Sequence, residues 1–367
     1  MADRLPEVWD LSPHTRAKHE ILRRYLGAWL PIMSRYNKRV IFFDGFAGPG
    51  VYSKGEPGSP KIALECLLEH RHAAQMSSCE FSYLFNEQEH DRFDSLSRMV
   101  DEFRRTGLPP NVHIVLENDS FEQTSEAIIE RLRSAGAQLA PTFAFVDPFG
   151  YADIPMATLK RLLSFDKCEL LVYLDINSLI RFATAGVVDD AFTALMGTED
   201  YRGAPATGVE RQVFMRDMYE RQLRNECGFA FTRSFLMRGP RNKPICYLFY
   251  ATRSIAGLAA MKEAMWSVAP IGDYTFSDSS AGQDVLFGLE VDTTPLRQQL
   301  CATFSCQATT IETIEQFVVE HTPFLKTHVK TRTLKPLEEE GRITVAPARG
   351  KSRRGGTFPP GTRITFV

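Results

Sequence analysis

The chain has 367 residues, of which 44% are hydrophobic and 24% charged, and its formal net charge is −2. This composition is typical of a soluble globular protein that is long enough for one large domain and a smaller second one. No apolar run approaches the ~20 residues that span a bilayer, and the first residues hold no apolar segment of a secretory signal. The near-zero net charge argues against a protein that coats nucleic acid with its whole surface.

The seven cysteines indicate a reducing compartment. Their number is odd and most lie inside apolar segments, so we expect buried thiols in the cytoplasm and no disulfide framework. Cys301 and Cys306 form the only close pair in the sequence. Because no second pair of ligands stands at suitable spacing, we expect no zinc site.

Strand and helix patterns alternate as far as Trp266. An amphipathic helix is predicted over 15–36, with a kink or restart at Pro31. Ser59 and Pro60 are typical of the cap and first residue of a second helix. Strands are predicted over 40–43, 81–85, 112–116, 142–146, 170–174 and 245–250. This alternation predicts an α/β fold with right-handed crossovers and a mostly parallel sheet.

The pattern changes twice. Residues from about 184 to 243 predict a mainly helical insertion into a domain of residues 1–300. Over 309–367 the order helix, helix, strand, loop, strand is typical of a winged-helix domain. We expect its basic loop to contact nucleic-acid phosphates, and a merely solvated loop is the alternative. The cations of this loop are Arg349, Lys351, Arg353 and Arg354.

The most informative stretch is the strand Val40-Ile41-Phe42-Phe43-Asp44 and the turn that follows it, Gly45-Phe46-Ala47-Gly48-Pro49-Gly50. A glycine-rich turn after a buried parallel strand lies at the carboxyl edge of the sheet, where cofactors bind. The spacing differs from the dinucleotide fingerprint G-x-G-x-x-G. It resembles instead the first motif of S-adenosylmethionine (SAM)-dependent methyltransferases, especially those that act on nucleic acids. An ordinary strand and turn is the alternative.

Four acids close successive predicted strands, namely Asp44, Glu87, Asp119 and Asp147. Because the carboxyl ends of parallel strands meet at one edge, we expect these acids to converge. Glu87 suits the two hydroxyls of a ribose, and Asp119 suits the exocyclic amine of an adenine. The backbone N–H groups from Phe46 to Gly50 are expected to face the carboxylate of a bound SAM. Each acid alone is equally typical of a helix cap or a turn.

The segment Asp147-Pro148-Phe149-Gly150 bears on the reaction. Methyltransferases acting on exocyclic amines place Asp/Asn/Ser-Pro-Pro-aromatic here, and the acid and the first proline's carbonyl hold the target amine. Gly150 stands at the aromatic position, so stacking on a flipped base is expected from Phe149 or Tyr151. The variant resembles the equivalent motif of tRNA guanine amine dimethyltransferases, and a turn that caps the next helix is the alternative.

Further candidates flank these motifs. Lys18 and His19, on the first predicted helix, could reach the cofactor edge or a phosphate, or lie on a solvated helix face. Asp175 and Asn177 follow the fifth predicted strand and are additional pocket candidates.

Several stretches together resemble the three-Cys-motif partner family, which consists of bacterial and phage-associated proteins often encoded beside a radical-SAM-like protein with three cysteines. The matching stretches are 18–26, 43–50, 58–60, 85–87, 146–150, 254–265 and 334–367. The first half also resembles large-subunit ribosomal RNA adenine methyltransferases, whose Asp-Thr-His-Ala-Gly-x-Gly-x-Tyr segment corresponds to 44–52 and adds Tyr52. The resemblance implies a Rossmann-like methyltransferase core with a doubly wound sheet, and a partner protein, but fixes no reaction.

Together these patterns favour a SAM-dependent methyltransferase acting on an exocyclic base amine of nucleic acid, RNA rather than DNA. The alternatives are a methyltransferase-like partner or specificity subunit of the three-cysteine protein, and a metal-dependent nuclease. The expected SAM-binding residues are Asp44, Gly45, Phe46, Ala47, Gly48, Pro49, Gly50, Tyr52, Glu87, Asp119 and Ser120. The expected catalytic residues are Asp147, Pro148, Phe149, Gly150 and Tyr151, and the expected nucleic-acid contacts are Lys18, Arg349, Lys351, Arg353 and Arg354.

Overall fold

The computed structural model describes residues 10–148, 150, 153–175, 189–206, 208–239, 242–269, 275–277, 291–349 and 351–367. The chain divides into two compact units, and each is described by itself. The sheet unit comprises Met1–Ala264 and Thr275–Gly282, and the C-terminal unit comprises Met265–Tyr274 and Gln283–Val367.

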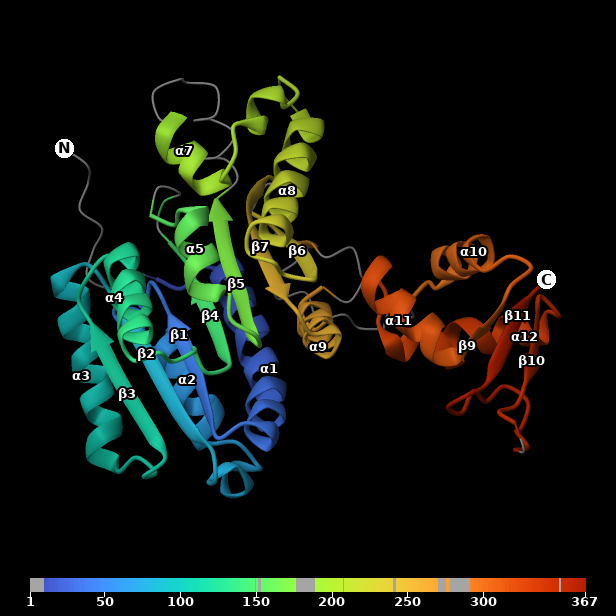
Figure 1. The fold of residues 1–367 in the computed structure, drawn as a ribbon, viewed down its shortest axis with the longest axis horizontal. Helices are drawn as coiled ribbons and strands as arrows, with labels where there is room; N and C mark the ends of the chain where they lie inside the picture. The colour runs from blue at the N-terminus through green and yellow to red at the C-terminus, as the bar shows by residue number, and fades with distance from the viewer. Residues whose placement is uncertain are drawn as a thin grey trace. The chain divides into compact units, whose positions relative to one another are not determined.

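The sheet unit is built on one sheet, whose described strands follow the order β3-β2-β1-β4-β5-β7-β6-β8 (Figure 1). The strands are β1 (Arg39–Asp44), β2 (Glu80–Asn86), β3 (Val112–Glu117), β4 (Thr142–Val146), β5 (Cys168–Asp175), β6 (Phe231–Arg238), β7 (Pro244–Thr252) and β8 (Thr275–Ser277). From β1 to β5 all pairings are parallel, and in register Phe43 lies between Leu84 and Ala144. The predicted strands and the mainly parallel α/β sheet are therefore confirmed.

The strand order reverses beside β1, whose neighbours are β2 on one side and β4 on the other. In a doubly wound sheet such a reversal opens a crevice at the carboxyl ends of the strands. β7 runs antiparallel between β5 and β6. Without β7 and the edge strand β8, the order is 3-2-1-4-5-6, which is that of a Rossmann-like sheet.

The prediction of a mainly helical insertion over 184–243 is wrong at its end, because residues 231–238 form β6. The first half of this strand, Phe231 to Ser234, is half-buried and carries Thr232 and Arg233, so it lacks the apolar run by which buried strands are recognised.

Two helix details also differ from expectation. Helix α1 continues through Pro31, so no restart occurs there, and α2 is capped by Gly58 without a side-chain hydrogen bond. The Ser59 hydroxyl interacts with Asp44 and is therefore not the predicted cap. The helices of the sheet unit are α1 (Pro13–Tyr36), α2 (Ser59–Leu68), α3 (His90–Thr106), α4 (Phe121–Ser134), α5 (Met156–Leu163), α7 (Asp189–Met196), α8 (Gly208–Asn225) and α9 (Ile255–Trp266), with short turns η1 (Ala73–Met76) and η2 (Asp200–Gly203).

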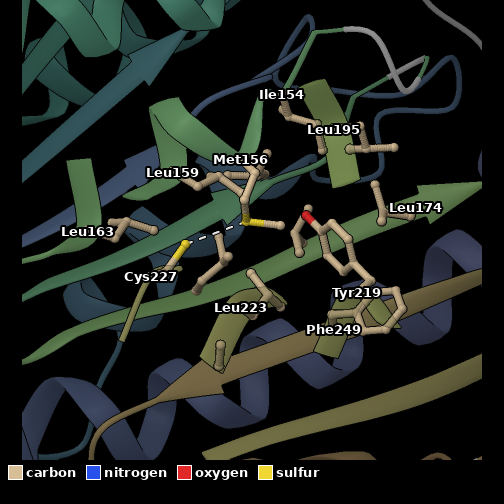
Figure 2. Packing of buried hydrophobic residues seen from close by; sticks show 14 of the residues in the cluster. Ile154, Met156, Leu159, Leu163, Leu174, Leu195, Tyr219, Leu223, Cys227 and Phe249 are labelled. Atoms are coloured by element: carbon tan, nitrogen blue, oxygen red, sulfur yellow. Dashed lines mark hydrogen bonds between the residues drawn. The ribbon is translucent and has the colours of Figure 1, made fainter. Parts of the chain in front are cut away.

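Alternate strand residues supply two cores, because successive side chains of a strand point to opposite faces of the sheet. On one face Phe143 lies 6.0 Å from Phe42 and 5.0 Å from Tyr25 of α1, measured between ring centroids. On the other face Phe43 belongs to a large apolar cluster with α5 and α8. Figure 2 shows Met156 of α5 and Leu223 of α8 meeting in that cluster.

A buried polar network ties α1 to the amino end of β5. The Tyr25 hydroxyl donates to Glu169 at 2.5 Å, the Thr252 hydroxyl donates to the other carboxylate oxygen at 2.8 Å, and the Tyr250 hydroxyl lies 2.7 Å from that of Tyr25. Burial raises the pKa of Glu169. A Cβ at Gly257 would lie 2.5 Å from the Glu169 carboxylate, so α9 can cover this network only with a glycine.

The C-terminal unit pairs helices with a small antiparallel sheet in the order β10-β11-β9. Its elements are α10 (Thr294–Thr303), β9 (Ala308–Thr310), α11 (Ile311–His321), η4 (Lys326–His328), η5 (Val329–Leu334), α12 (Lys335–Glu339), β10 (Ile343–Ala346) and β11 (Arg363–Phe366). The predicted helices and strands over 311–367 are present, whereas α10 and β9 were not predicted. Leu300, Ile314, Leu337 and Ile364 have no exposed surface and form part of its core.

All seven cysteines are free thiols, and five of them are buried. Among the described residues, no helix combines the length and the apolar character that a bilayer crossing requires.

We predict that Leu223→Ala lowers the free energy of unfolding of the sheet unit by about 2–5 kcal/mol, since it leaves a cavity in a closely packed core. Leu223 has no exposed surface, whereas Val209 on the same helix is 74% exposed. Val209→Ala is therefore the matched control and should change stability by less than about 0.5 kcal/mol. Urea unfolding followed by circular dichroism measures both, and equal effects of the two variants would contradict the packing described.

Candidate functional site

A polar cavity of about 210 Å³ lies at the carboxyl edge of the sheet, beside the reversal of strand order. Helix α1, the glycine turn, the loop before α2 and the ends of β4 and β5 surround it. The predicted site residues that line it are Lys18, Phe46, Ala47, Gly48, Pro49, Gly50, Tyr52, Asp147 and Pro148. Asp175 also lines the cavity, together with Thr15, His19, Val51, Gly58, Ser59 and Tyr173.

Asp44 is fully buried at the end of β1, and neither it nor Gly45 is among the residues that line the cavity. One carboxylate oxygen, Oδ1, accepts the N–H of Phe46 at 3.2 Å, while Oδ2 has no hydrogen-bond partner. Burial raises the pKa of Asp44 to about 7; the Ser59 hydroxyl and the Phe46 N–H act in the opposite direction. A buried carboxylate with an unpartnered oxygen can accept a donor or a positive charge from a ligand.

The glycine turn is held from behind by Glu87. Its carboxylate accepts the N–H of Gly48 at 2.9 Å and that of Glu89 at 2.9 Å, and Arg92 lies 3.7 Å away. Burial raises the pKa of Glu87, and these neighbours oppose the effect. Glu87 does not line the cavity in this arrangement, and its role toward a ribose stays a prediction.

The N–H groups of the turn are largely used inside the protein. Phe46 donates to Asp44, Ala47 donates to the carbonyl of Asn86 at 2.8 Å, and Gly48 donates to Glu87. The expectation that the turn's N–H groups face a ligand carboxylate is therefore not met for these three residues. The turn instead lets its backbone come close to the cavity. Gly48 and Gly50 both adopt positive φ, of 62° and 79°, which residues with a Cβ rarely adopt.

Lys18 and Asp147 form an ion pair across the cavity. The Lys18 side chain is 6% exposed and that of Asp147 22%, and the Lys18 ammonium also lies 4.9 Å from the ring centroid of Tyr173. The interpretation of Lys18 as part of a solvated helix face is thereby excluded. Such a pair fixes the position of the Asp147 carboxylate beside the glycine turn.

His19 follows Lys18 into the cavity wall and is 7% exposed. Its ring lies 5.6 Å from that of Tyr52 between centroids. Burial, followed by the charges of Lys18 and Arg23, holds the pKa of His19 well below its usual range, so this ring is neutral at physiological pH. Burial raises the pKa of Tyr52, whose hydroxyl therefore stays protonated.

Sequence reasoning missed Thr15, Ser59 and Tyr173 as cavity residues. Thr15 stands three and four positions before Lys18 and His19, which is the spacing of one helix face, and Tyr173 shares a strand face with Asp175 two residues on. These two signals were available, whereas the position of Ser59 depends on the course of the loop.

Other predicted site residues lie elsewhere or outside the described residues. Asp119 lines a different cavity, of about 180 Å³, along β2, β3 and α4. The Ser120 hydroxyl accepts the N–H of Gln123 at 3.2 Å and caps α4. Gly150, two residues after Pro148, is half-buried. Phe149, Tyr151 and Asn177 lie outside the described residues.

The basic loop, defined here as residues 347–362 without Gly350, belongs to the C-terminal unit. Arg349, Lys351 and Arg354 are exposed. Arg353 differs from them, because its side chain is 10% exposed and forms an ion pair with Glu338. Three of the four predicted cations of the loop thus present their charge to solvent.

A metal centre is not supported in the part of the chain that the structure describes. There, no group of three or more His, Cys, Asp or Glu side chains is placed to hold a metal ion. The cluster of Asp44, Glu87 and Asp147 that the nuclease alternative requires is not formed.

No family model and no curated protein matches this chain. Among solved structures it is similar to one described as a predicted O-methyltransferase from Agrobacterium tumefaciens, with 11% identity over 63% of this chain and 79% of that one and a TM-score of 0.31. A structure described as a methyltransferase from Escherichia coli has 14% identity over 64% and 86%, with a TM-score of 0.30. A structure described as a class I SAM-dependent methyltransferase from Listeria monocytogenes has 10% identity over 64% and 60%, with a TM-score of 0.30. Similarity at these TM-scores carries no argument about function, and the fold is assigned from the strand order.

We predict that Gly58→Ala lowers the free energy of unfolding by about 1–3 kcal/mol, because the added Cβ would overpack the glycine turn. It would lie 2.9 Å from the carbonyl oxygen of Gly50, which is backbone and cannot turn aside. Gly27→Ala is the control, since a Cβ there meets nothing within 4 Å inside α1. That variant should stabilise the protein by up to about 1 kcal/mol. Urea unfolding measures the free energy of unfolding of both variants. A Gly58→Ala protein as stable as wild type would argue against the tight turn.

Proposed function

We propose that this chain is a SAM-dependent methyltransferase that acts on an exocyclic base amine of nucleic acid, RNA being favoured over DNA. The observation that carries the proposal is the position of Asp147. It follows β4 directly, lies in the same cavity as the glycine turn and is held there by Lys18. The residue proposed to accept the amine and the turn proposed to bind SAM thus line the same cavity.

The residues of the cavity fit SAM. When bound, SAM supplies an electrophilic methyl group on a positively charged sulfonium. Asp44 lies behind the cavity wall, hydrogen-bonded to the N–H of Phe46, and its unpartnered Oδ2 provides buried negative character for the positive groups of such a ligand. Of the expected cofactor residues, Phe46 to Gly50 and Tyr52 form the cavity wall, and Glu87 supports the turn from behind.

Asp147 acts by orientation. Its carboxylate and the Pro148 carbonyl accept hydrogen bonds from the two N–H groups of the target amine, which directs the nitrogen lone pair toward the methyl group. The Lys18 ammonium fixes the carboxylate for this task, and the buried, neutral His19 adds no positive charge to the wall. No general base is required, since the amine can lose its proton to water after the transfer.

The nucleic-acid part of the proposal is supported by the C-terminal unit. Its order of helices with a three-stranded antiparallel sheet is compatible with the winged-helix arrangement that the sequence predicts. The exposed cations of the basic loop, Arg349, Lys351 and Arg354, are those that we expect to contact phosphates.

A second candidate function is a methyltransferase-like partner or specificity subunit without transfer activity of its own. The observation that favours it is Gly150, which offers no ring at the position of the stacking aromatic. The three-cysteine protein implied by the family resemblance is the partner that we would test.

We predict that Asp147→Ala lowers the rate of methyl transfer at least about 100-fold while SAM binding persists, because only the orientation of the amine is lost. Labelled-methyl transfer to total RNA and DNA, together with calorimetric titration of SAM, measures the two properties. Asp153→Ala, an exposed acid of the same loop, is the control and should keep both. Near-normal turnover of Asp147→Ala would overturn the mechanism. Absence of SAM binding by the folded wild type would instead favour the partner subunit.

We predict that the affinity for SAM rises about tenfold between pH 6 and pH 8, because a carboxyl group with a pKa of about 7 changes from mostly protonated to mostly ionised over this range. The sign follows from the positive charges of SAM, which favour the ionised Asp44. Asp44→Asn removes this titration and leaves only that of the ligand's own α-amino group, near pH 8. Calorimetric titrations of both proteins across this range give the comparison, and parallel pH profiles would exclude Asp44 as the titrating group.

A further inference from the structure

Two glutamates from other elements hold the basic loop in its middle and near its end. In the middle, the Glu338 carboxylate of α12 forms an ion pair with Arg353 and accepts the N–H of Gly356 at 3.0 Å. Near its end, the N–H of Gly361 donates to Glu312 of α11 at 2.7 Å. The conformation of the loop therefore depends on two carboxylates, Glu338 and Glu312, that belong to helices outside it.

Glu338 makes the more extensive set of contacts. Both of its oxygens contact the Arg353 guanidinium, and hydrogen bonding with Arg353 holds the pKa of Glu338 below its usual range, so the pair is ionised at neutral pH. Arg353 continues the network, since it donates to the carbonyl of Thr357 at 2.9 Å and lies 5.7 Å from the ring centroid of the buried Phe358.

The basic residues of the loop differ in their exposure. Arg353 turns inward to Glu338, while its neighbours Lys351 and Arg354 remain exposed. Gly356, with φ at +71°, lies against the aliphatic part of Lys335, because a Cβ there would come within 3.2 Å of that chain. The loop thus contacts α12 through Arg353 and Gly356, while Arg349, Lys351 and Arg354 are exposed.

We infer that Glu338 is a positioning residue for nucleic-acid binding: it holds the basic loop in the conformation in which Arg349, Lys351 and Arg354 are presented together. This inference rests on the proposed nucleic-acid function of the C-terminal unit. An acidic residue, Glu338, is thus required for the binding of a polyanion.

Loss of the Glu338 carboxylate should change the affinity for nucleic acid in the direction opposite to that expected from charge alone. Removing a negative charge near a phosphate-binding surface should raise affinity, because the protein's field becomes more positive. Loss of a positioning contact should lower affinity instead, since the three exposed cations would no longer share one geometry. Glu339, the next residue, is exposed and its carboxylate lies 3.9 Å from the Lys335 ammonium one turn earlier in α12, so it serves as the control for the removal of a negative charge.

The experiment compares full-length wild type, Glu338→Ala, Glu338→Gln and Glu339→Ala in binding to a fluorescein-labelled RNA hairpin across a salt series. Glu338→Ala should bind more weakly than wild type and lower the slope of log K against log salt by about 1 or more. Glu339→Ala should bind as tightly as wild type or more tightly. Glu338→Gln, which can still accept the Gly356 N–H, should lie between wild type and Glu338→Ala. Binding by Glu338→Ala that matches or exceeds that of Glu339→Ala would overturn the inference.

Two further measurements separate this inference from the proposed function. The triple variant Arg349→Ala, Lys351→Ala, Arg354→Ala tests whether the loop binds nucleic acid at all, and unchanged RNA affinity would count against that function. Hydrogen exchange of the loop amides, Gly356 above all, tests positioning without any ligand. Exchange faster in Glu338→Ala than in Glu339→Ala, in proteins with wild-type circular dichroism, supports the positioning role. Equal exchange in the two variants contradicts it.

Discussion

Carboxylates buried at the edge of an apolar sheet must find hydrogen bonds or positive charge, because an uncompensated ion in that environment costs several kcal/mol. The architecture of the site follows from how each acid meets this requirement. Glu87 is satisfied by two backbone N–H groups and Arg92, and it thereby fixes the glycine turn. Asp147 is satisfied by Lys18, which brings α1 to the cavity. Asp44 accepts the N–H of Phe46 from the turn with one oxygen, and its buried Oδ2 keeps no hydrogen-bond partner.

The C-terminal unit uses the same chemistry for a different purpose. There the acids Glu312, Glu315 and Glu338 neutralise or anchor selected cations and backbone groups and leave the others exposed. Glu315, for example, receives both Lys326 and Lys330 at about 3 Å. The cations of this unit are thus divided into those that hold the fold together and those that face solvent. This division depends on partners distant in the sequence, and a count of basic residues does not reveal it.

The parts that could be predicted from the sequence are those decided locally. The strands 142–146 and 170–174 were found because strands buried on both faces are continuous apolar runs, and the acids after them lie at one edge because the strands are parallel. β6 was missed because its outer half is polar, and the buried state of Lys18 was missed because its partner lies 129 residues away. The separation of Arg353 from its neighbouring cations has the same cause, since sequence spacing does not report which charge meets an acid.

The network around Glu169 has a consequence for the opposite edge of the sheet. Tyr25 stands seven residues, or about two helical turns, after Lys18, so both side chains leave the same face of α1. Fixing Tyr25 against Glu169 and Tyr250 therefore sets the rotational phase and the axial position of the whole helix. A slip by one residue would move Lys18 about 1.5 Å along the axis and rotate it about 100° away from Asp147. The contacts at the amino edge of the sheet thus align the residues that line the cavity at its carboxyl edge.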